Sequence, residues 1–296
     1  MKKFSKLIAL VLSVLFVAGC FAACSSGNAD EKPSDAVKES TAKVKVINID
    51  LSNEEYAFGV DKKQPELMEQ TNAFIKEIKE NGKLDEICNR YFGNGAPVGV
   101  TSAAEDSSKE QLVVATNAEF KPFEYKEGDT FYGIDMEIAK LLADKLGKEL
   151  VIKDMKFDAV LLSVQQGKCD IGMAGLTVSE DRKKQVDFSE SYYAASQKLI
   201  VKADDTTFDN CKTKEDVDAI LNGLDATVKI GGQNGTTGQS YVEGSEDLGF
   251  AGLKATFAGY DNGSLAVQDL INGGVQYVII DAAPAAAITT AINAVS

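Results

Sequence analysis

The sequence predicts an α/β protein with two mostly parallel sheets covered by helices. Two observations lead to this fold class. From residue 112 onward, short apolar runs alternate with segments whose apolar side chains recur about every 3.6 residues, and the connections are short. The chain has 296 residues, which is enough for two domains of ordinary size. We therefore expect two such sheets.

The first elements are expected between residues 44 and 93. Short strands are predicted at 44–49 and 56–60. Pro65 then begins a helix whose apolar side chains share one face, namely Leu67, Thr71, Phe74, Ile75 and Ile78. A second short helix follows, with an apolar face formed by Leu84, Ile87, Cys88, Tyr91 and Phe92. Residues 95–111 are rich in Gly, Pro, Ser and acidic residues, show no period, and are expected to be a linker.

The regular alternation follows this linker. Strands are expected at 112–115, 150–152, 171–174, 199–201, 228–230, 255–257 and 278–280. Helices are expected at 134–146, 157–166, 213–221, 238–242, 264–271 and 284–294, with a further short helix after the N-cap Ser179.

The N-terminus predicts the compartment. Three lysines precede the apolar run Leu7–Ala18, so residues 1–19 have the layout of a secretory signal. The following Cys20 is placed as in a bacterial lipobox, with Cys24 as a weaker candidate for lipidation. Residues 20–43 lack an apolar period and are expected to form a flexible tether. The sequence therefore predicts an extracytoplasmic lipoprotein anchored to the cell membrane.

Composition excludes several function classes. The formal charge is −14, which disfavours nucleic acid as a partner. The chain has no His, so histidine-dependent nucleophile systems and His-ligated metal sites are excluded, and we expect no metal or cofactor. Beyond the tether only Cys88, Cys169 and Cys211 remain, an odd number without a close pair, which gives no disulfide framework.

Several blocks after residue 111 carry a resemblance to a known family. They are Leu112–Tyr125, Gly133–Glu137, Asp170–Arg182, Val186–Ser189, Gly235–Gly238 and Val278–Pro284. In these blocks the chain resembles the polar amino-acid family of periplasmic-type substrate-binding proteins, the receptors of ABC importers. The resemblance implies a two-lobed type II periplasmic-binding-protein fold with two hinge strands. It also implies a monomer that binds a free amino acid between its lobes and delivers it to the permease subunits of an importer.

The family's final elements stand at the opposite end of this chain. Segments similar to them are found at 43–50, 55–62, 64–82 and 87–93. We therefore predict a circular permutant, divided into a lobe 2 strand and hinge (44–55), C-terminal elements of lobe 1 (56–94), the linker (95–111), lobe 1 (112–200) and lobe 2 (201–296). Two alternatives stay open: residues 44–93 could complete a neighbouring molecule in a swapped dimer, or they could be the remnant of a duplicated domain.

An amino-acid zwitterion needs hydrogen bonds for both of its charges when it leaves water. The planar fork of Arg182 suits the carboxylate, beside the backbone amides of a helix start. Asp281, at the end of an apolar strand, would bind the ammonium from the second lobe, although a role as helix N-cap is an alternative. The resemblance adds Gly175 and Thr177 as neighbours of the two charges, and Thr236 and Thr237 as backbone donors to the carboxylate.

The resemblance also implies a pocket for the ligand side chain. Phe120 and Phe157 are expected to enclose it. Asn117 stands where many relatives have Asp, and a neutral amide cannot neutralise a cationic side chain, so a neutral polar amino acid is expected. Gln233 points to the same ligand class. Glu119 would supply a negative charge only if its loop turned it inward.

Closure of the lobes on the ligand is the expected mechanism, because contact with both walls stabilises the closed form. An enzyme similar to cyclohexadienyl dehydratase is one alternative and would need a general acid in the cleft. An amino-acid-sensing protein with the same site is another. The chain is expected not to be an enzyme.

Overall fold

The computed structural model describes residues 42–93 and 95–295. The predicted signal peptide, the candidate lipidation sites Cys20 and Cys24, and nearly all of the predicted tether lie outside these residues. In the described part of the chain, no helix is both long and apolar enough to cross a membrane.

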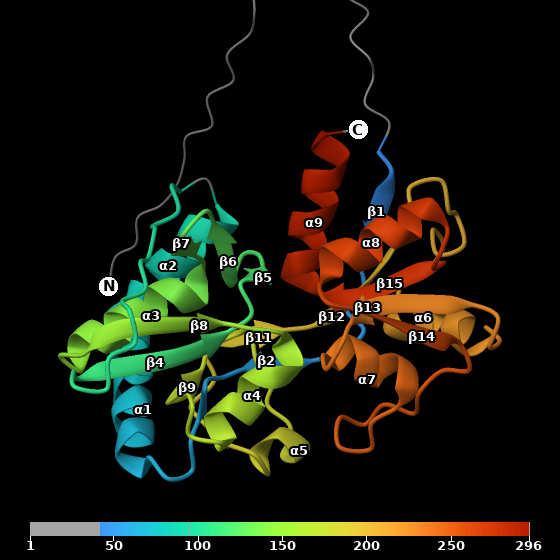
Figure 1. The fold of residues 1–296 in the computed structure, drawn as a ribbon. Helices are drawn as coiled ribbons and strands as arrows, with labels where there is room; N and C mark the ends of the chain where they lie inside the picture. The colour runs from blue at the N-terminus through green and yellow to red at the C-terminus, as the bar shows by residue number, and fades with distance from the viewer. Residues whose placement is uncertain (1–41, 94, 296) are drawn as a thin grey trace, which may run out of the picture. The chain divides into compact units, whose positions relative to one another are not determined.

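Lobe 1 is built on a five-stranded sheet (Figure 1). Its strand order is β10 (Asp187–Phe188), β3 (Gly59–Val60), β9 (Ile171–Gly172), β4 (Gln111–Thr116) and β8 (Glu149–Asp154). The helices that belong to this lobe are α1 (Pro65–Glu80), α2 (Lys83–Phe92), α3 (Ile134–Lys145), α4 (Phe157–Gln165) and the short α5 (Glu180–Lys183). A three-stranded sheet of β5 (Glu119–Phe120), β6 (Glu124–Glu127) and β7 (Thr130–Tyr132) follows β4.

Lobe 2 is built on a second five-stranded sheet. Its order is β1 (Val44–Ile47), β12 (Gln197–Lys202), β15 (Tyr277–Asp281), β13 (Lys229–Gln233) and β14 (Thr256–Tyr260). The helices of this lobe are α6 (Lys214–Asn222), α7 (Thr237–Glu243), α8 (Gly263–Asn272) and α9 (Ala282–Ala294). The predicted α/β class and the two sheets are confirmed.

The prediction of mostly parallel sheets is wrong. β13 runs parallel to β14 and β15, and β4 runs parallel to β8 and β9. However, β12 is antiparallel to β1 and β15, and β3 is antiparallel to β9 and β10. The reason is connectivity: β1, β3, β10 and β12 belong to the stretches that carry the chain between the lobes, so they are not joined by a crossover helix.

Two strands meet between the lobes. β2 (Glu54–Tyr56) pairs antiparallel with β11 (Tyr193–Ala195), and Figure 1 shows this pair between the two sheets. The sequence predicted a single strand over 56–60. The structure instead contains two short strands, β2 and β3, because the chain leaves the hinge ladder at Tyr56 before it enters the sheet of lobe 1.

Residues 44–93 pack within their own chain and contribute to both sheets. β1 adds an edge strand to lobe 2, and β3 lies inside the sheet of lobe 1. The apolar face predicted for α1 is buried in full, from Leu67 to Ile78. In α2, Arg90 donates to Glu137 of α3 at 2.5 Å, and the Tyr91 hydroxyl donates to the same carboxylate at 2.6 Å. The segment therefore completes the fold in this structure, and its relation to the element order of relatives stays a prediction.

The predicted linker 95–111 has specific partners along lobe 1. Val100 exchanges two backbone hydrogen bonds with Phe131 of β7, at 2.8 and 2.9 Å. The Ala103 amide donates to the Leu150 carbonyl of β8, and the Ser102 hydroxyl accepts from the Ile152 amide at 2.8 Å. The linker lies along these strands, and its last residue, Gln111, begins β4.

Candidate site between the lobes

Arg182 lies where lobe 1 meets lobe 2. As predicted, Ser179 caps the short helix α5, its hydroxyl accepting from the Arg182 amide. The guanidinium donates to the Thr177 carbonyl of its own lobe at 2.7 Å and to the Gly235 carbonyl of lobe 2 at 3.0 Å. Its central carbon lies 5.4 Å from the centre of the Phe157 ring. Burial lowers the pKa of Arg182, whereas Asp281 and Glu54 oppose that shift.

The backbone amides at the start of α5 already have an anionic partner. The Glu180 and Asp181 amides each donate to the carboxylate of Asp247, a loop residue of lobe 2, at 3.0 Å. The sequence predicted that these amides would support a ligand carboxylate beside Arg182. The structure contradicts that detail, because an acidic side chain from the other lobe accepts these hydrogen bonds.

Asp281 ends β15 and is 5% exposed. The Tyr56 hydroxyl donates to its Oδ2 at 2.5 Å. Burial raises the pKa of Asp281 to about 7, and the Glu54 carboxylate adds to the rise, whereas the hydrogen bonds from Tyr56 and Gln197 oppose it. Although Asp281 occupies the N-cap position of α9, its side chain makes no capping hydrogen bond. Its described side-chain partner is instead the hydroxyl of Tyr56, from the hinge strand β2.

Glu54 and Tyr56 are residues of this site that the sequence did not suggest. Both are buried, while Glu55 between them is exposed, as the period of two in a strand requires. The Glu54 carboxylate accepts from Thr177 at 2.6 Å, from Gln197 at 3.1 Å and from Ser52 at 2.5 Å. Glu54 lies two residues before the strand predicted at 56–60, so the alternation within that strand gave no signal for its burial.

Phe120 and Gly175 are in close contact. Gly175 has a φ of +54°, and a Cβ atom placed on it would lie 3.0 Å from Phe120 and 3.3 Å from Tyr56. A side chain at this position would therefore strain the backbone and collide with two rings. The Gly175 amide donates to Asp135 at 2.9 Å, and the same carboxylate accepts from the Tyr192 hydroxyl at 2.6 Å.

Asn117 and Gln233 bind each other across the lobes. The Gln233 amide donates to Asn117 Oδ1 at 2.8 Å, and Asn117 Nδ2 donates to the Met155 carbonyl at 2.8 Å. Both side chains are buried. Glu119, in contrast, is exposed and accepts from Asn262 of lobe 2 at 3.0 Å, so its carboxylate lies at the rim and not inside.

Thr236 and Thr237 lie at the start of α7, and both are buried. The Thr236 hydroxyl donates to the Gln233 carbonyl at 2.8 Å. At the rim, Lys156 of lobe 1 pairs with Asp261 of lobe 2 at 2.9 Å. The predicted site residues thus gather along the boundary between the lobes, with Arg182, Phe120 and Asn117 on one side and Gln233, Thr237 and Asp281 on the other.

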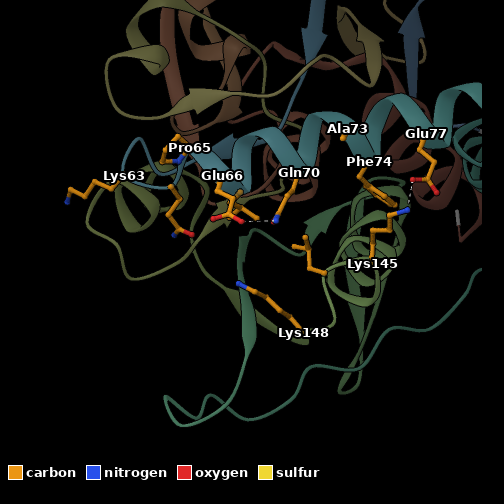
Figure 2. A pocket seen from close by; sticks show the side chains of 12 residues that line it. Lys63, Pro65, Glu66, Gln70, Ala73, Phe74, Glu77, Lys145 and Lys148 are labelled. Carbon is orange, nitrogen blue, oxygen red and sulfur yellow. Dashed lines mark hydrogen bonds and ion pairs between the residues drawn. The ribbon is translucent and has the colours of Figure 1, made fainter.

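Tyr56 and Asp281 line a small cavity, and a separate surface groove lies elsewhere on lobe 1. The cavity, about 50 Å³, is lined by Tyr56, Phe123, Tyr193 and Asp281 among others. The groove is larger, about 720 Å³, and lies away from the boundary, between α1 and the residues that follow α3. Figure 2 shows that its polar side chains pair with each other, Lys145 with Glu77 and Gln70 with Glu66. We assign no ligand to this groove.

Comparisons with known proteins identify the family. The family model described as bacterial extracellular solute-binding proteins, family 3, matches residues 112–274, more than half of the chain. The chain belongs to this family. Residues 44–93, which supply Glu54 and Tyr56, lie outside the matched range.

Two curated relatives are named for arginine. The chain is 42% identical over 106 residues to the arginine-binding extracellular protein ArtP of Bacillus subtilis (strain 168), covering 36% of this chain and 42% of that protein. It is 30% identical over 183 residues to the arginine-binding periplasmic protein of Mannheimia haemolytica, covering 62% of this chain and 65% of that protein. The chain therefore spans less than two thirds of the length of either relative.

Solved structures of family members share the fold. One is an ancestral arginine-binding protein bound to arginine, with a TM-score of 0.52 and 36% identity, covering 62% of this chain and 75% of that chain. Another is an ancestral amino acid-binding protein described as a precursor of cyclohexadienyl dehydratase, with a TM-score of 0.51 and 32% identity, covering 71% of this chain and 78% of that chain. The fold of this chain is accordingly the two-lobed fold of type II periplasmic binding proteins.

Proposed function

We propose that this protein binds a free polar L-amino acid between its two lobes and delivers it to an ABC importer. One observation supports this function above the others. A half-buried guanidinium from lobe 1, Arg182, and a buried carboxylate from lobe 2, Asp281, lie on the two sides of one boundary and act on each other electrostatically.

This pair matches the charges of a zwitterion. Removing an amino acid from water is costly unless both of its charged groups regain hydrogen bonds. The guanidinium would bind the α-carboxylate, and Asp281 would bind the α-ammonium. The guanidinium now donates to the carbonyls of Thr177 and Gly235, one from each lobe, so a ligand carboxylate would replace these weaker acceptors. A ligand held by both lobes would favour the closed form by its differential affinity.

A neutral polar amino acid is the proposed ligand. The amides of Asn117 and Gln233 carry no charge, and the Glu119 carboxylate is at the exposed rim. A cationic ligand is the rival, since the curated relatives above are named for arginine. An ancestral arginine-binding protein has been solved with glutamine bound (TM-score 0.51, 37% identity, covering 62% of this chain and 74% of that chain), so both ligand classes occur among similar structures.

Calorimetric titration of the protein with each of the twenty amino acids tests this proposal. We expect glutamine or asparagine to bind most tightly, with micromolar affinity, which corresponds to about 8 kcal/mol. Tightest binding of arginine or lysine would overturn the neutral assignment and leave the receptor function intact. Failure of every amino acid to bind would overturn the function itself.

The dehydratase alternative rests on the buried carboxyl group of Asp281, whose pKa of about 7 would suit a general acid. Incubation of the protein with prephenate or arogenate distinguishes the two functions. We expect no turnover, because Asp281 is assigned to the ligand ammonium. Sustained product formation would favour the enzyme.

We also propose that the receptor is a lipoprotein anchored at Cys20 and works as a monomer. Labelling of cells with a radioactive fatty acid tests the anchor. A Cys20→Ala variant should lose the label and a Cys24→Ala variant should keep it. The reverse result would assign the anchor to Cys24.

A further inference from the structure

Tyr56 occupies an unusual position beside the proposed ligand site. It comes from the hinge strand β2, is fully buried, and packs edge-on against Phe123 with ring centres 5.0 Å apart. Its hydroxyl is directed at a carboxylate of lobe 2, Asp281 Oδ2, at 2.5 Å. Burial and the nearby Asp281 raise the pKa of Tyr56 well above its usual range, so the hydroxyl stays protonated and can only donate to this carboxylate.

The surroundings of Asp281 are rich in acid. Glu54 on β2 and Glu124 on β6 both act on it electrostatically, and Arg182 is the cation that opposes them. Asp281 also raises the pKa of Tyr193 on β11, and Gln197 on β12 donates a hydrogen bond to Asp281. The helix that follows Asp281, α9, contains no charged side chain. Ionised Asp281 is therefore stabilised by one cation and two uncharged donors and is opposed by Glu54.

Glu124 is a second buried acid that interacts electrostatically with Asp281. It is fully buried, and neither of its carboxylate oxygens has a hydrogen-bond partner within the described residues. It pairs with Phe120 across the β5–β6 hairpin, so their side chains lie on the same face of the hairpin. An ionised carboxylate without partners is costly in such a place. Burial therefore raises the pKa of Glu124 well above its usual range and favours its neutral form.

We propose that Tyr56 is a positioning residue for Asp281: its hydroxyl holds the carboxylate toward the cleft and keeps it ionised for a ligand cation. This inference rests on the proposed function. The tyrosine does not need to touch the ligand. Its hydroxyl stabilises the ionised state of Asp281 and leaves the other carboxylate oxygen available to the ligand ammonium.

Ligand binding should then depend on pH in a defined direction. The carboxylate is needed in its ionised form, so affinity is full well above the pKa of Asp281 and falls as the pH drops through about 7. Between pH 8 and pH 6 we expect a loss of about tenfold in affinity. Without the Tyr56 hydroxyl the carboxylate is harder to ionise, so the midpoint of this loss should move to higher pH.

Tyr56→Phe, titrated with the best-binding amino acid of the calorimetric screen between pH 5.5 and 9, tests the proposal. Tyr192→Phe is the matched control, because Tyr192 is also buried (5% exposed) and donates to a buried carboxylate, Asp135, at 2.6 Å. Both variants lose one hydrogen bond to a carboxyl group and keep an aromatic ring. We expect Tyr56→Phe to weaken binding about tenfold or more at pH 7 and to raise the midpoint, and Tyr192→Phe to change neither.

The outcomes separate this inference from the function on which it depends. Equal affinity and an unchanged midpoint in Tyr56→Phe, with normal binding by the unaltered protein, overturn the positioning role. Equal losses in Tyr56→Phe and Tyr192→Phe overturn it as well, since they would reflect general loosening of the core. Absence of binding by the unaltered protein overturns the proposed function instead. Circular dichroism of both variants confirms that they fold.

Discussion

The segment before the linker and the segment after it contribute to the site in different ways. Residues 112–296 contain the groups proposed to touch the ligand, such as Arg182 and Asp281. Residues 44–93 supply the buried groups behind them, Glu54 and Tyr56, through hydrogen bonds to Thr177 and Asp281. The family model covers Arg182, but it ends before Asp281 and does not reach residues 44–93. The difference teaches that contacts to a ligand can be found by motif, while the residues that orient those contacts depend on which strands the fold brings beside them.

The largest expected effect concerns residues 112–296, which contain the proposed ligand contacts. Arg182→Ala should abolish amino-acid binding in calorimetry, because a bidentate partner of the ligand carboxylate is lost. The melting temperature of the empty protein should stay within a few degrees, since the hydrogen bonds described for the guanidinium go to two backbone carbonyls. Lys183→Ala is the control, as its exposed side chain pairs with Glu180. Collapse of the Arg182→Ala variant in the absence of ligand would make Arg182 structural.

The next largest effect tests whether residues 44–93 pack against the lobes of their own chain. Glu137→Gln removes the charge and replaces one of the two carboxylate oxygens that accept from Arg90 and Tyr91 with an amide donor. We expect a loss of about 2 kcal/mol in the free energy of unfolding. Glu149→Gln, which breaks an exposed pair with Lys109, should change this free energy little, because water screens such a pair. Urea titration measures both.

Light scattering during size-exclusion chromatography completes this test. The unaltered protein should have the mass of one chain, as expected if residues 44–93 complete their own lobes. A stable dimer that dissociates in the Glu137→Gln variant would instead indicate exchange of this segment between chains.

A smaller effect concerns ligand choice. Asn117→Asp would place a carboxylate where Gln233 now binds an amide oxygen. We expect the affinity for arginine relative to glutamine to rise about tenfold, which calorimetry with both ligands measures. Asn222→Asp, with the same charge change at the exposed end of α6, should leave the ratio unaltered. An unchanged ratio in Asn117→Asp would show that this position does not face the ligand side chain.

The smallest effect is on stability and depends on pH. Burial raises the pKa of Glu124, so folding penalises its ionised form. The penalty is absent below the pKa of an unfolded glutamate, about 4.3, and grows as the pH rises through the folded value. Glu124→Gln should therefore raise the melting temperature by a few degrees at pH 8 and change it little at pH 4.

The exposed Glu119→Gln variant serves as the control for this measurement. It removes the same charge from the same three-stranded sheet, at a side chain that water can reach. A similar gain in both variants at pH 8 would point to the net charge of the protein and not to the buried carboxyl group.

The sequence indicated much of the fold, because periodicity and turn residues are local signals. The buried face of α1 and the cap of α5 at Ser179 were both predictable in this way. The strand directions were not, since β1 and β12 pair antiparallel between distant segments. At the site, charge chemistry and family resemblance suggested Arg182 and Asp281. Tyr56 was missed, because its role follows only from the fold that places its hydroxyl against a carboxylate 225 residues away.

The first strand also has a consequence for how the protein is made. Among the described residues, β1 pairs with β12, with Val44 opposite Lys202. The amides of Lys43 and Val44 donate to Asn293 near the end of α9. At a synthesis rate of about 5–20 residues per second, the ribosome needs roughly 8–30 s to reach β12 after β1. β1 is therefore made well before its partner strand, and its backbone groups cannot form this ladder during that interval.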